Sequence, residues 1–471
     1  MWNNALADGN FGITSKILLD QMTPSGTLID SLEVPNSSQN GVPPTKDQLV
    51  TSFSSKSELA LNLSTDGNYL TFMGYVAPIN ALDVSNANTP AIIDPTNPVP
   101  DAFYRAVAQV DQHGKFRYTE TNAYSGNNGR AAILHNTQGA EVLYTAGNAG
   151  NGSDPQPDGI IIGAGAQIMT PEVKAEVAQN PGTPTPVASF NITQLGFAHD
   201  KIGKDTNFRG LTIFNDVLYY TKGSGGNGVN TVYFVDTTGQ ACPSTSTTPG
   251  VGLPQSAAQL PTAGLLYDPA VVQTQGLEPT NMCILKGFPT ALKSKTAFPF
   301  GLWFADATTL YVADEGNGDN TYDAVTNKYT KAPAQTNAGL QKWVLEAGTW
   351  TRVYTLQAGL GLGIPYVVPG YPTVTNPENH NLPWAPATDG LRNITGRVNG
   401  DGTVTIWAIT STVSGNGDQG ADPNQLVVIT DTVATTTLPA PATEHFTTVR
   451  TAGFGEVLRG VAFTPGTSVT R

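Results

Sequence analysis

The sequence of 471 residues predicts an all-β protein built as a six-bladed β-propeller. The first observation is the stretch from Phe208 to Asp236, which contains three short runs rich in β-branched and aromatic residues. A polar turn at Asn215 and Asp216 separates the first two runs, as in a β-hairpin. The second observation is that this pattern recurs along the chain, and the third is that no segment shows sustained helical periodicity.

Alignment of the repeated units fixes the number of blades that we expect. The units share one equivalent position, occupied by Glu58, Arg130, Arg209, Phe300, Arg392 and Arg459. Successive positions are 67 to 92 residues apart, and the distance from the last position through the C-terminus to the first is 70 residues. This closing distance is also one unit long, which predicts a closed ring of six blades rather than an open solenoid.

Each unit is expected to supply the inner strand of one blade within a single domain spanning residues 1–471. The inner strands are expected near residues 57–64, 130–136, 208–214, 299–305, 391–398 and 457–464. The N-terminal hairpin at residues 12–35 has no inner strand before it. We therefore expect Val457–Thr464 to pair with Ser15–Gln21 or with residues N-terminal of it. The sixth blade would then combine both ends of the chain and leave no open sheet edge.

Composition excludes several classes of partner. The net charge of −13 disfavours binding to nucleic acid, which requires a basic surface. No apolar run approaches the ~20 residues of a membrane-spanning helix, so we expect no membrane span. The abundance of Thr, Asn and Gly predicts a monomeric protein that is secreted, periplasmic or held at the cell surface. We expect its signal peptide to be absent from this sequence.

The two cysteines, Cys242 and Cys283, flank a long insertion in the third blade. A disulfide between them would close a loop of about 40 residues and stabilise the insertion. The alternative is a pair of buried thiols. The polar surroundings and the expected extracellular location favour the disulfide.

Arginine occupies four of the six equivalent positions, namely Arg130, Arg209, Arg392 and Arg459. In a propeller these positions surround the mouth of the central channel. Guanidinium groups bind carboxylate, sulfate or phosphate through two hydrogen bonds, so the four side chains, with Glu58, predict a site for an anionic ligand. The alternative is that each arginine bonds the main chain of a neighbouring blade and serves only the scaffold.

Glycine-rich loops follow the strands on the same face and contain candidate metal ligands. Asp314, Glu315, Asp319 and Asp323 offer the hard oxygen ligands that Ca²⁺ prefers. Their spacing differs from that of an EF-hand loop. Either they bind calcium, the one cofactor we expect, or they form solvated turns.

Three residues are candidate proton acceptors. His199 and His380 fall in the connections that lead to Arg209 and Arg392, and Tyr124 precedes Arg130. A histidine beside arginines is held neutral and can act as a base. With an arginine that neutralises a carboxylate, such a base predicts a lyase acting on uronates; the alternative is polar residues in loops without catalysis.

The repeated units resemble those of uncharacterised secreted bacterial β-propeller proteins, as in the Arg209-Gly210 and Arg459-Gly460 pairs and the strand that follows them. The resemblance implies the fold and export of the protein. Two other six-bladed families are partly similar. β-Propeller phytases bind calcium and phosphate but have acidic signatures that this sequence lacks, and gluconolactonase-like propellers hold a metal with a glutamate that Glu58 resembles.

Together these observations predict an extracellular propeller that binds an anionic ligand at the channel mouth, either a small saccharide-derived anion or an acidic polysaccharide. An enzyme of this kind would be a lyase or hydrolase of a carboxylated, phosphorylated or lactone substrate. The alternative is a cell-surface or matrix module without turnover.

Overall fold

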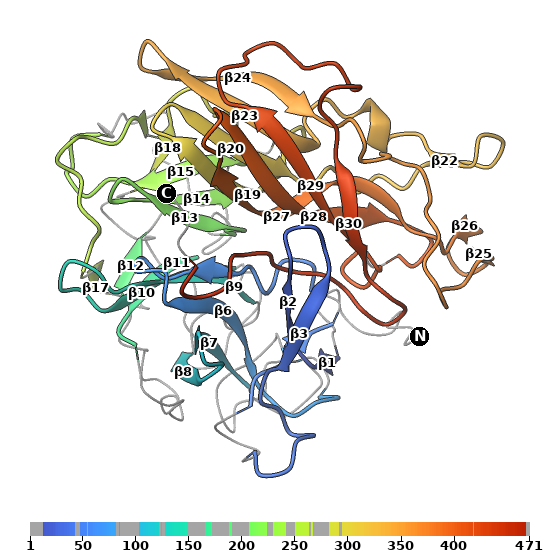
Figure 1. Cartoon of the computed structure of the whole chain (residues 1–471), viewed down its shortest axis with the longest axis horizontal. Coiled ribbons are helices and arrows are strands. Elements are labelled where there is room, and N and C mark those ends of the chain that lie inside the picture. Colours follow the sequence, from blue (N-terminus) through green and yellow to red (C-terminus); the bar gives the residue numbers. More distant parts are fainter. Residues whose placement is uncertain are drawn as a thin grey trace, which may run out of the picture.

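A computed structural model gives the fold of the chain (Figure 1). The structure describes residues 13–42, 48–53, 55–81, 84, 103–121, 124, 128–148, 165–171, 188–190, 207–223, 229–241, 250–262, 265–266, 282–291, 294–417 and 419–467. Within these ranges the elements are strands apart from one short 3-10 helix, η2 (Ala332–Ala334). No helix in the described part of the chain is long and apolar enough to cross a membrane.

Five antiparallel blades form the β-propeller, which confirms the predicted fold class but not the number of blades. Blade 1 contains β5 (Asn62–Leu63), β6 (Tyr69–Val76), β7 (Tyr104–Asp111) and β8 (Phe116–Thr121). Blade 2 contains β9 (Gly129–His135), β10 (Val142–Gly147), β11 (Ala166–Met169) and β12 (Ala188–Phe190). Its outer edge is extended by β17 (Leu265–Leu266).

Blades 3 to 5 complete the series around the centre (Figure 1). Blade 3 contains β13 (Leu211–Phe214), β14 (Val217–Lys222), β15 (Thr231–Val235) and β18 (Met282–Leu285), with β16 (Val251–Gly252) parallel to β18. Blade 4 contains β19 (Pro299–Asp306), β20 (Thr309–Asp314), β23 (Gly339–Glu346) and β24 (Thr349–Leu356). Blade 5 contains β27 (Ala387–Val398), β28 (Thr403–Val413), β29 (Gln425–Thr432) and β30 (Thr447–Thr451).

Short two-stranded sheets lie outside the blades. They pair β1 (Thr14–Ser15) with β4 (Thr51–Ser52), β2 (Leu18–Met22) with β3 (Leu28–Glu33), β21 (Tyr322–Asp323) with β22 (Lys328–Tyr329), and β25 (Thr375–Asn376) with β26 (Leu382–Pro383).

The predicted turn at Asn215 and Asp216 is confirmed. These two residues join β13 to β14, and both have positive φ values, 47° and 58°. Two consecutive left-handed residues form the turn type whose twist matches that of antiparallel strands, and Asn and Asp tolerate this conformation. The turn therefore sets the register in which Phe214 lies opposite Val217.

The prediction of a sixth blade is wrong. Val457–Thr464 forms no strand and does not pair with Ser15–Gln21. Main-chain groups of this segment bond elsewhere, since Leu458 N donates to Asn424 Oδ1 at 2.8 Å. Side chains of the segment, including Phe463, pack with Trp407 of blade 5 instead. Equal spacing of the repeats could not reveal this difference, because spacing does not report which hydrogen bonds form.

The hairpin β2–β3 lies between blade 5 and blade 1 and is held there by side chains (Figure 1). Arg450 of β30 forms an ion pair with Asp20 of β2. Trp407 Nε1 donates to Pro24 O at 3.1 Å in the hairpin turn. The ring is therefore completed by packing and individual polar contacts rather than by a shared sheet.

The predicted Cys242–Cys283 disulfide cannot be followed to both ends, because Cys242 lies outside the described residues. Cys283 is fully buried in β18, opposite Phe234. The disulfide stays a prediction.

Aromatic side chains fill the space between blades 3 and 4. Phe304 of β19 stacks on Phe214 with ring centroids 4.6 Å apart, and Tyr219 lies at the same distance from Phe304. Large buried aromatic rings contribute strongly to stability through the apolar area they remove from water. Phe304 is therefore a principal contact between these two blades.

We expect Phe304→Ala to lower the free energy of unfolding by about 3–5 kcal/mol, because it opens a cavity between two blades. Val325→Ala is the control, since Val325 is 94% exposed and its truncation should change little. Denaturant unfolding followed by circular dichroism measures both. Equal midpoints for the two variants would contradict the assignment of Phe304 to the inter-blade core.

Candidate functional site

The repeat position lies at the centre of the ring, where each blade meets the next. All six residues that occupy it are buried: Glu58, Arg130, Arg209, Phe300, Arg392 and Arg459. In three of the six units the next residue is a glycine that packs on main chain of a neighbouring segment of the ring, namely Gly210, Gly301 and Gly460. A Cβ atom at Gly210 would lie 2.5 Å from Phe300 O, and one at Gly301 would lie 2.6 Å from Arg392 O. Only glycine fits at such an approach, which accounts for the Arg-Gly pairs in the repeat.

Two of the four arginines bond the scaffold. Arg130 Nη1 donates to Phe208 O of blade 3 at 2.8 Å. Arg459 Nη2 donates to Gly420 O at 2.9 Å and also to Phe53 O, on opposite sides of the junction between the chain ends and blade 5. The hydrogen bonds of these two side chains join neighbouring parts of the ring, as the scaffold alternative expects. The charges of Arg209 and Glu315 also act on Arg130 and shift its pKa in opposite directions.

The other two arginines face a shared carboxylate, Glu315, which directly follows β20. Arg392 Nε lies 3.2 Å from Glu315 Oε2, and Arg209 Nη2 lies 3.8 Å from Oε1. Lys56 joins them, with Nζ 3.4 Å from Oε1. We call these four residues, Lys56, Arg209, Glu315 and Arg392, the central cluster.

Glu315 remains ionised in this cluster. Burial opposes the charged form, but the positive charges of Lys56, Arg209 and Arg392 together outweigh burial and lower its pKa to about 2. The carboxylate is 3% exposed, so water contributes little to its stabilisation. It is the shared counter-charge of the three cations.

The cations are undercompensated. Burial, with repulsion from Arg209 and Arg392, lowers the pKa of Lys56 to about 8, although Glu315 opposes the shift. Burial and repulsion from Arg392 likewise lower the pKa of Arg209, against the attraction of Glu315. The buried Nη2 atom of Arg392 has no hydrogen-bond partner within the described residues. Three cations around one carboxylate leave an excess positive charge.

Two nearby carboxyl groups, Asp314 and Asp389, compensate part of this excess charge. Burial raises the pKa of Asp314 to about 7 and that of Asp389 to about 6, and the charge of Glu315 contributes to both shifts. Both groups accept main-chain hydrogen bonds, Asp314 from Phe298 N at 2.8 Å and Asp389 from Gly318 N at 2.8 Å. Near pH 7 Asp314 is therefore about half protonated, whereas Asp389 is mostly ionised.

Glu58 does not belong to the central cluster. Its carboxylate accepts hydrogen bonds from Thr51 Oγ1 at 2.7 Å, Ser52 N at 3.0 Å and the hydroxyl of Tyr75. Burial and the charge of Glu58 raise the pKa of Tyr75. Glu58 thus connects β4 to β6, and the structure gives it a role in the scaffold.

The three candidate proton acceptors differ in their surroundings. The charge of Arg130 acts on Tyr124 and opposes the effect of burial on its pKa. Tyr124 is fully buried, its hydroxyl lies 2.6 Å from Thr145 Oγ1, and burial raises its pKa. His380 is exposed in the turn between β25 and β26. His199 lies outside the described residues. Lys56, whose amine could accept a proton, lies beside Arg209 and Arg392 around Glu315.

The predicted calcium ligands have separate roles. Asp319 Oδ1 accepts hydrogen bonds from Thr321 N at 2.9 Å and Thr321 Oγ1 at 2.6 Å, and Asp323 similarly holds the turn that contains Val325. Asp314 accepts a hydrogen bond from Phe298 N, and Glu315 forms ion pairs with the cations of the central cluster. Across the part of the chain that the structure describes, no group of three or more His, Cys, Asp or Glu side chains is arranged to hold a metal ion. Calcium binding stays a prediction.

Sequence reasoning missed Lys56 and the true role of Glu315. Lys56 stands two residues before Glu58, which occupies the repeat position of its unit. This closeness in sequence could have placed Lys56 near the arginines. Glu315 lies in a loop with three other acidic residues, and this grouping indicated a metal rather than a counter-charge.

Comparison with protein-family models found no match, and comparison with curated proteins found none either. The function must therefore be inferred from the geometry of the site.

We expect Glu315→Gln to destabilise the protein by about 3–5 kcal/mol at pH 7, because it leaves three buried cations without their counter-charge. The folded-state pKa of Glu315 lies below its usual value of 4.5. Its contribution is therefore complete above pH 4.5 and is lost as the pH falls toward 2. Denaturant unfolding of both proteins at several pH values measures the difference.

The exposed Glu346, on β23 of the same blade, provides the control, since Glu346→Gln should leave stability nearly unchanged. A difference between wild type and Glu315→Gln that does not shrink below pH 4.5 would contradict an ionised Glu315 in the folded state.

Proposed function

We propose that the central cluster binds an anionic ligand that carries a carboxylate, sulfate or phosphate group. The observation that carries this proposal is the placement of Lys56, Arg209 and Arg392 around the single carboxylate of Glu315. An anion would relieve the excess positive charge and supply an acceptor for Arg392 Nη2, which has no partner in the described structure.

The energetic argument depends on burial. Two unit charges 4 Å apart interact by about 1 kcal/mol in water and by about 4 kcal/mol in the environment near a protein surface. Arg209 and Arg392 are 4% and 3% exposed, so water screens their repulsion poorly. Arginine remains charged and forms paired hydrogen bonds with carboxylate and phosphate, which favours an anion as the partner of these side chains.

The arginines are held in position before a ligand arrives. The guanidinium of Arg209 lies over the ring of Phe300 at 5.6 Å, and that of Arg392 is fixed by its ion pair with Glu315. Lys56 keeps a third of its side-chain surface exposed, so the cluster is reachable from solvent at this residue. Such preorganisation lowers the entropy cost of binding.

The abundance of Thr, Asn and Gly supports an extracellular setting, and the arginines of the central cluster support an anionic ligand. We propose an extracellular protein whose ligand is an acidic saccharide or a small acid derived from one. A binding or matrix module without turnover requires only the central cluster.

The pKa of Lys56, about 8, favours a second candidate function, elimination on a uronate. In such a reaction Arg209 and Arg392 would neutralise the substrate carboxylate, and the neutral amine of Lys56 would remove the proton from the adjacent carbon. The bond from the next ring carbon to the glycosidic oxygen would break as the new carbon–carbon double bond forms. The departing oxygen would then take a proton from water.

Replacement of Arg392 by Gln tests anion binding. We expect sulfate, phosphate or galacturonate to bind the wild-type protein at millimolar concentration or below, as measured by titration calorimetry in low salt. Arg392→Gln should weaken binding by about 10- to 100-fold, because a hydrogen bond to a charged group contributes about 1.5–3 kcal/mol. Arg397→Gln is the matched control, since Arg397 lies on the same strand but is exposed.

Absence of binding of all three anions to the folded wild-type protein would contradict the proposal. Equal affinities in Arg392→Gln and Arg397→Gln would also contradict it. Circular dichroism of each variant separates loss of binding from loss of fold.

Replacement of Lys56 by Gln tests the elimination reaction. With polygalacturonate as substrate, ultraviolet absorbance should report an unsaturated product, and turnover should rise with pH through about 8 as Lys56 loses its proton. Lys56→Gln should abolish turnover while galacturonate still binds through the arginines. If the wild-type protein binds galacturonate but forms no unsaturated product, the elimination reaction is excluded and the binding module without turnover is supported.

A further inference from the structure

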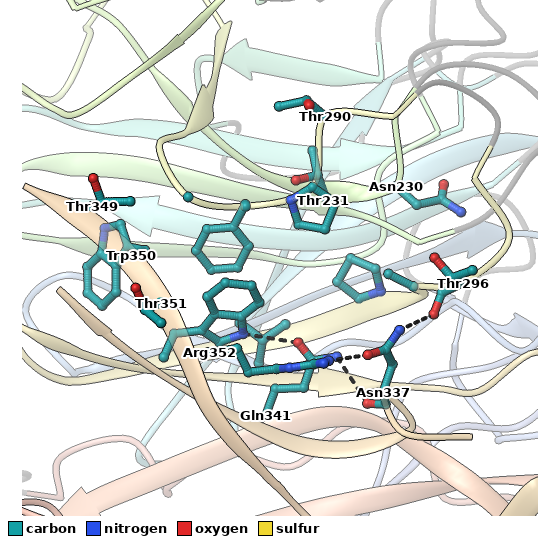
Figure 2. A pocket seen from close by; sticks show the side chains of 17 residues that line it. Asn230, Thr231, Thr290, Thr296, Asn337, Gln341, Thr349, Trp350, Thr351 and Arg352 are labelled. Atoms are coloured by element: carbon teal, nitrogen blue, oxygen red, sulfur yellow. Dashed lines mark hydrogen bonds between the residues drawn. The ribbon is translucent and has the colours of Figure 1, made fainter. Parts of the chain in front are cut away.

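A cavity of about 660 Å³ lies between blades 3 and 4, apart from the central cluster (Figure 2). Its walls come from the start of β15, the turn after β18, the start of β19 and the strands β20, β23 and β24. This volume is within the range of roughly 300–1,000 Å³ that is usual for small-molecule sites. None of the residues of the central cluster lines it.

Aromatic residues form one wall. Phe288 stacks on Trp343 with ring centroids 3.9 Å apart and planes inclined by 20°. Trp343 is held by its Nε1, which donates to Gln341 Oε1 at 3.0 Å. Trp350 adds a third ring, and its carbonyl would lie 1.9 Å from a Cβ atom at Gly287, so the turn after β18 packs directly on β24. The wall is therefore rigid.

Two buried polar atoms in the lining have no partner among the described residues. They are Asn230 Oδ1 and Thr231 Oγ1, on side chains that are 3% and 1% exposed. A buried polar atom without a hydrogen bond costs about 1–3 kcal/mol. A ligand that donates to Asn230 Oδ1 and pairs with the hydroxyl of Thr231 would remove this cost.

Opposite Asn230 and Thr231, a row of polar side chains lies along β23 and β24 (Figure 2). Arg352 donates to Asn337 Oδ1, and Gln341 Nε2 donates to Asn337 O at 3.0 Å. Arg352 is the one charged residue in the lining. Burial lowers the pKa of its guanidinium, although the charge of Asp314 opposes the shift. Most of the lining is thus uncharged, which favours a neutral ligand.

We propose that this cavity binds a neutral, polyhydroxylated ring such as one or two hexopyranose units. A sugar ring presents apolar C–H faces suited to aromatic side chains, and its hydroxyl groups both donate and accept hydrogen bonds. A proline-rich peptide fits less well, because proline has no N–H to donate to Asn230 Oδ1. The cavity and the central cluster therefore recognise different chemistry, and either proposal stands without the other.

The isosteric change Thr231→Val provides the sharpest test, because it removes a hydroxyl that has no partner within the described protein. The folded protein should become no less stable, whereas saccharide binding should weaken. Thr388→Val is the matched control: the Thr388 hydroxyl is also buried and without a partner, but the residue does not line the cavity. Maltose, cellobiose and lactose are the probes, followed by tryptophan fluorescence and calorimetry on the full chain.

We expect at least one disaccharide to bind the wild-type protein with a Kd of about 10 mM or lower. Thr231→Val should weaken that binding by about fivefold or more, the effect of one hydrogen bond of about 1 kcal/mol. Thr388→Val should bind as the wild type does. The proposal is overturned when no disaccharide binds, when a proline-rich peptide binds in their place, or when the two variants have the same affinity.

Discussion

The ion cluster around Glu315 is the constraint on which the centre of the ring depends. One buried carboxylate, contributed by the loop after β20 of blade 4, holds Arg209 of blade 3, Arg392 of blade 5 and Lys56 from the segment before blade 1. Segments distant in sequence therefore converge on a single charge. Buried charges are costly unless paired, so each contributing segment must be placed correctly before the cluster is stable. The same cluster thus couples the position of several blades to the chemistry of the site.

Repetition explains which parts of the fold the sequence could predict. The hairpin at Asn215 and Asp216 was predictable because its residues tolerate the left-handed conformation that the turn requires. The all-β propeller class followed from the recurring pattern of strands and turns. The number of blades did not follow, because Val457–Thr464 resembles an inner strand in sequence but bonds through Asn424 and packs against Trp407. Such contacts join residues far apart in the chain and leave no local pattern.

The candidate site shows the same division between local and distant information. Arg130, Arg209, Arg392 and Arg459 could be grouped from the repeat, but their separation into scaffold and cluster depends on where each guanidinium finds an acceptor. Arg130 meets a carbonyl of blade 3, whereas Arg392 meets the Glu315 side chain. Lys56 escaped notice because it stands outside the aligned position. The cavity between blades 3 and 4 was not predictable, since its lining comes from segments without a shared motif.

The ring closes at the junction between the two chain ends and blade 5. Strands β27 and β28 belong to a four-stranded sheet, whereas β2 and β3 pair only with each other and are attached to blade 5 by side chains such as Asp20 and Arg450. Local opening begins where few main-chain hydrogen bonds resist it, so amide hydrogens in β2 and β3 should exchange with solvent before those of β27 and β28. Arg459 spans this junction through hydrogen bonds from Nη2 to Gly420 O and Phe53 O. Arg459, one of the six residues at the repeat position, therefore helps to close the ring.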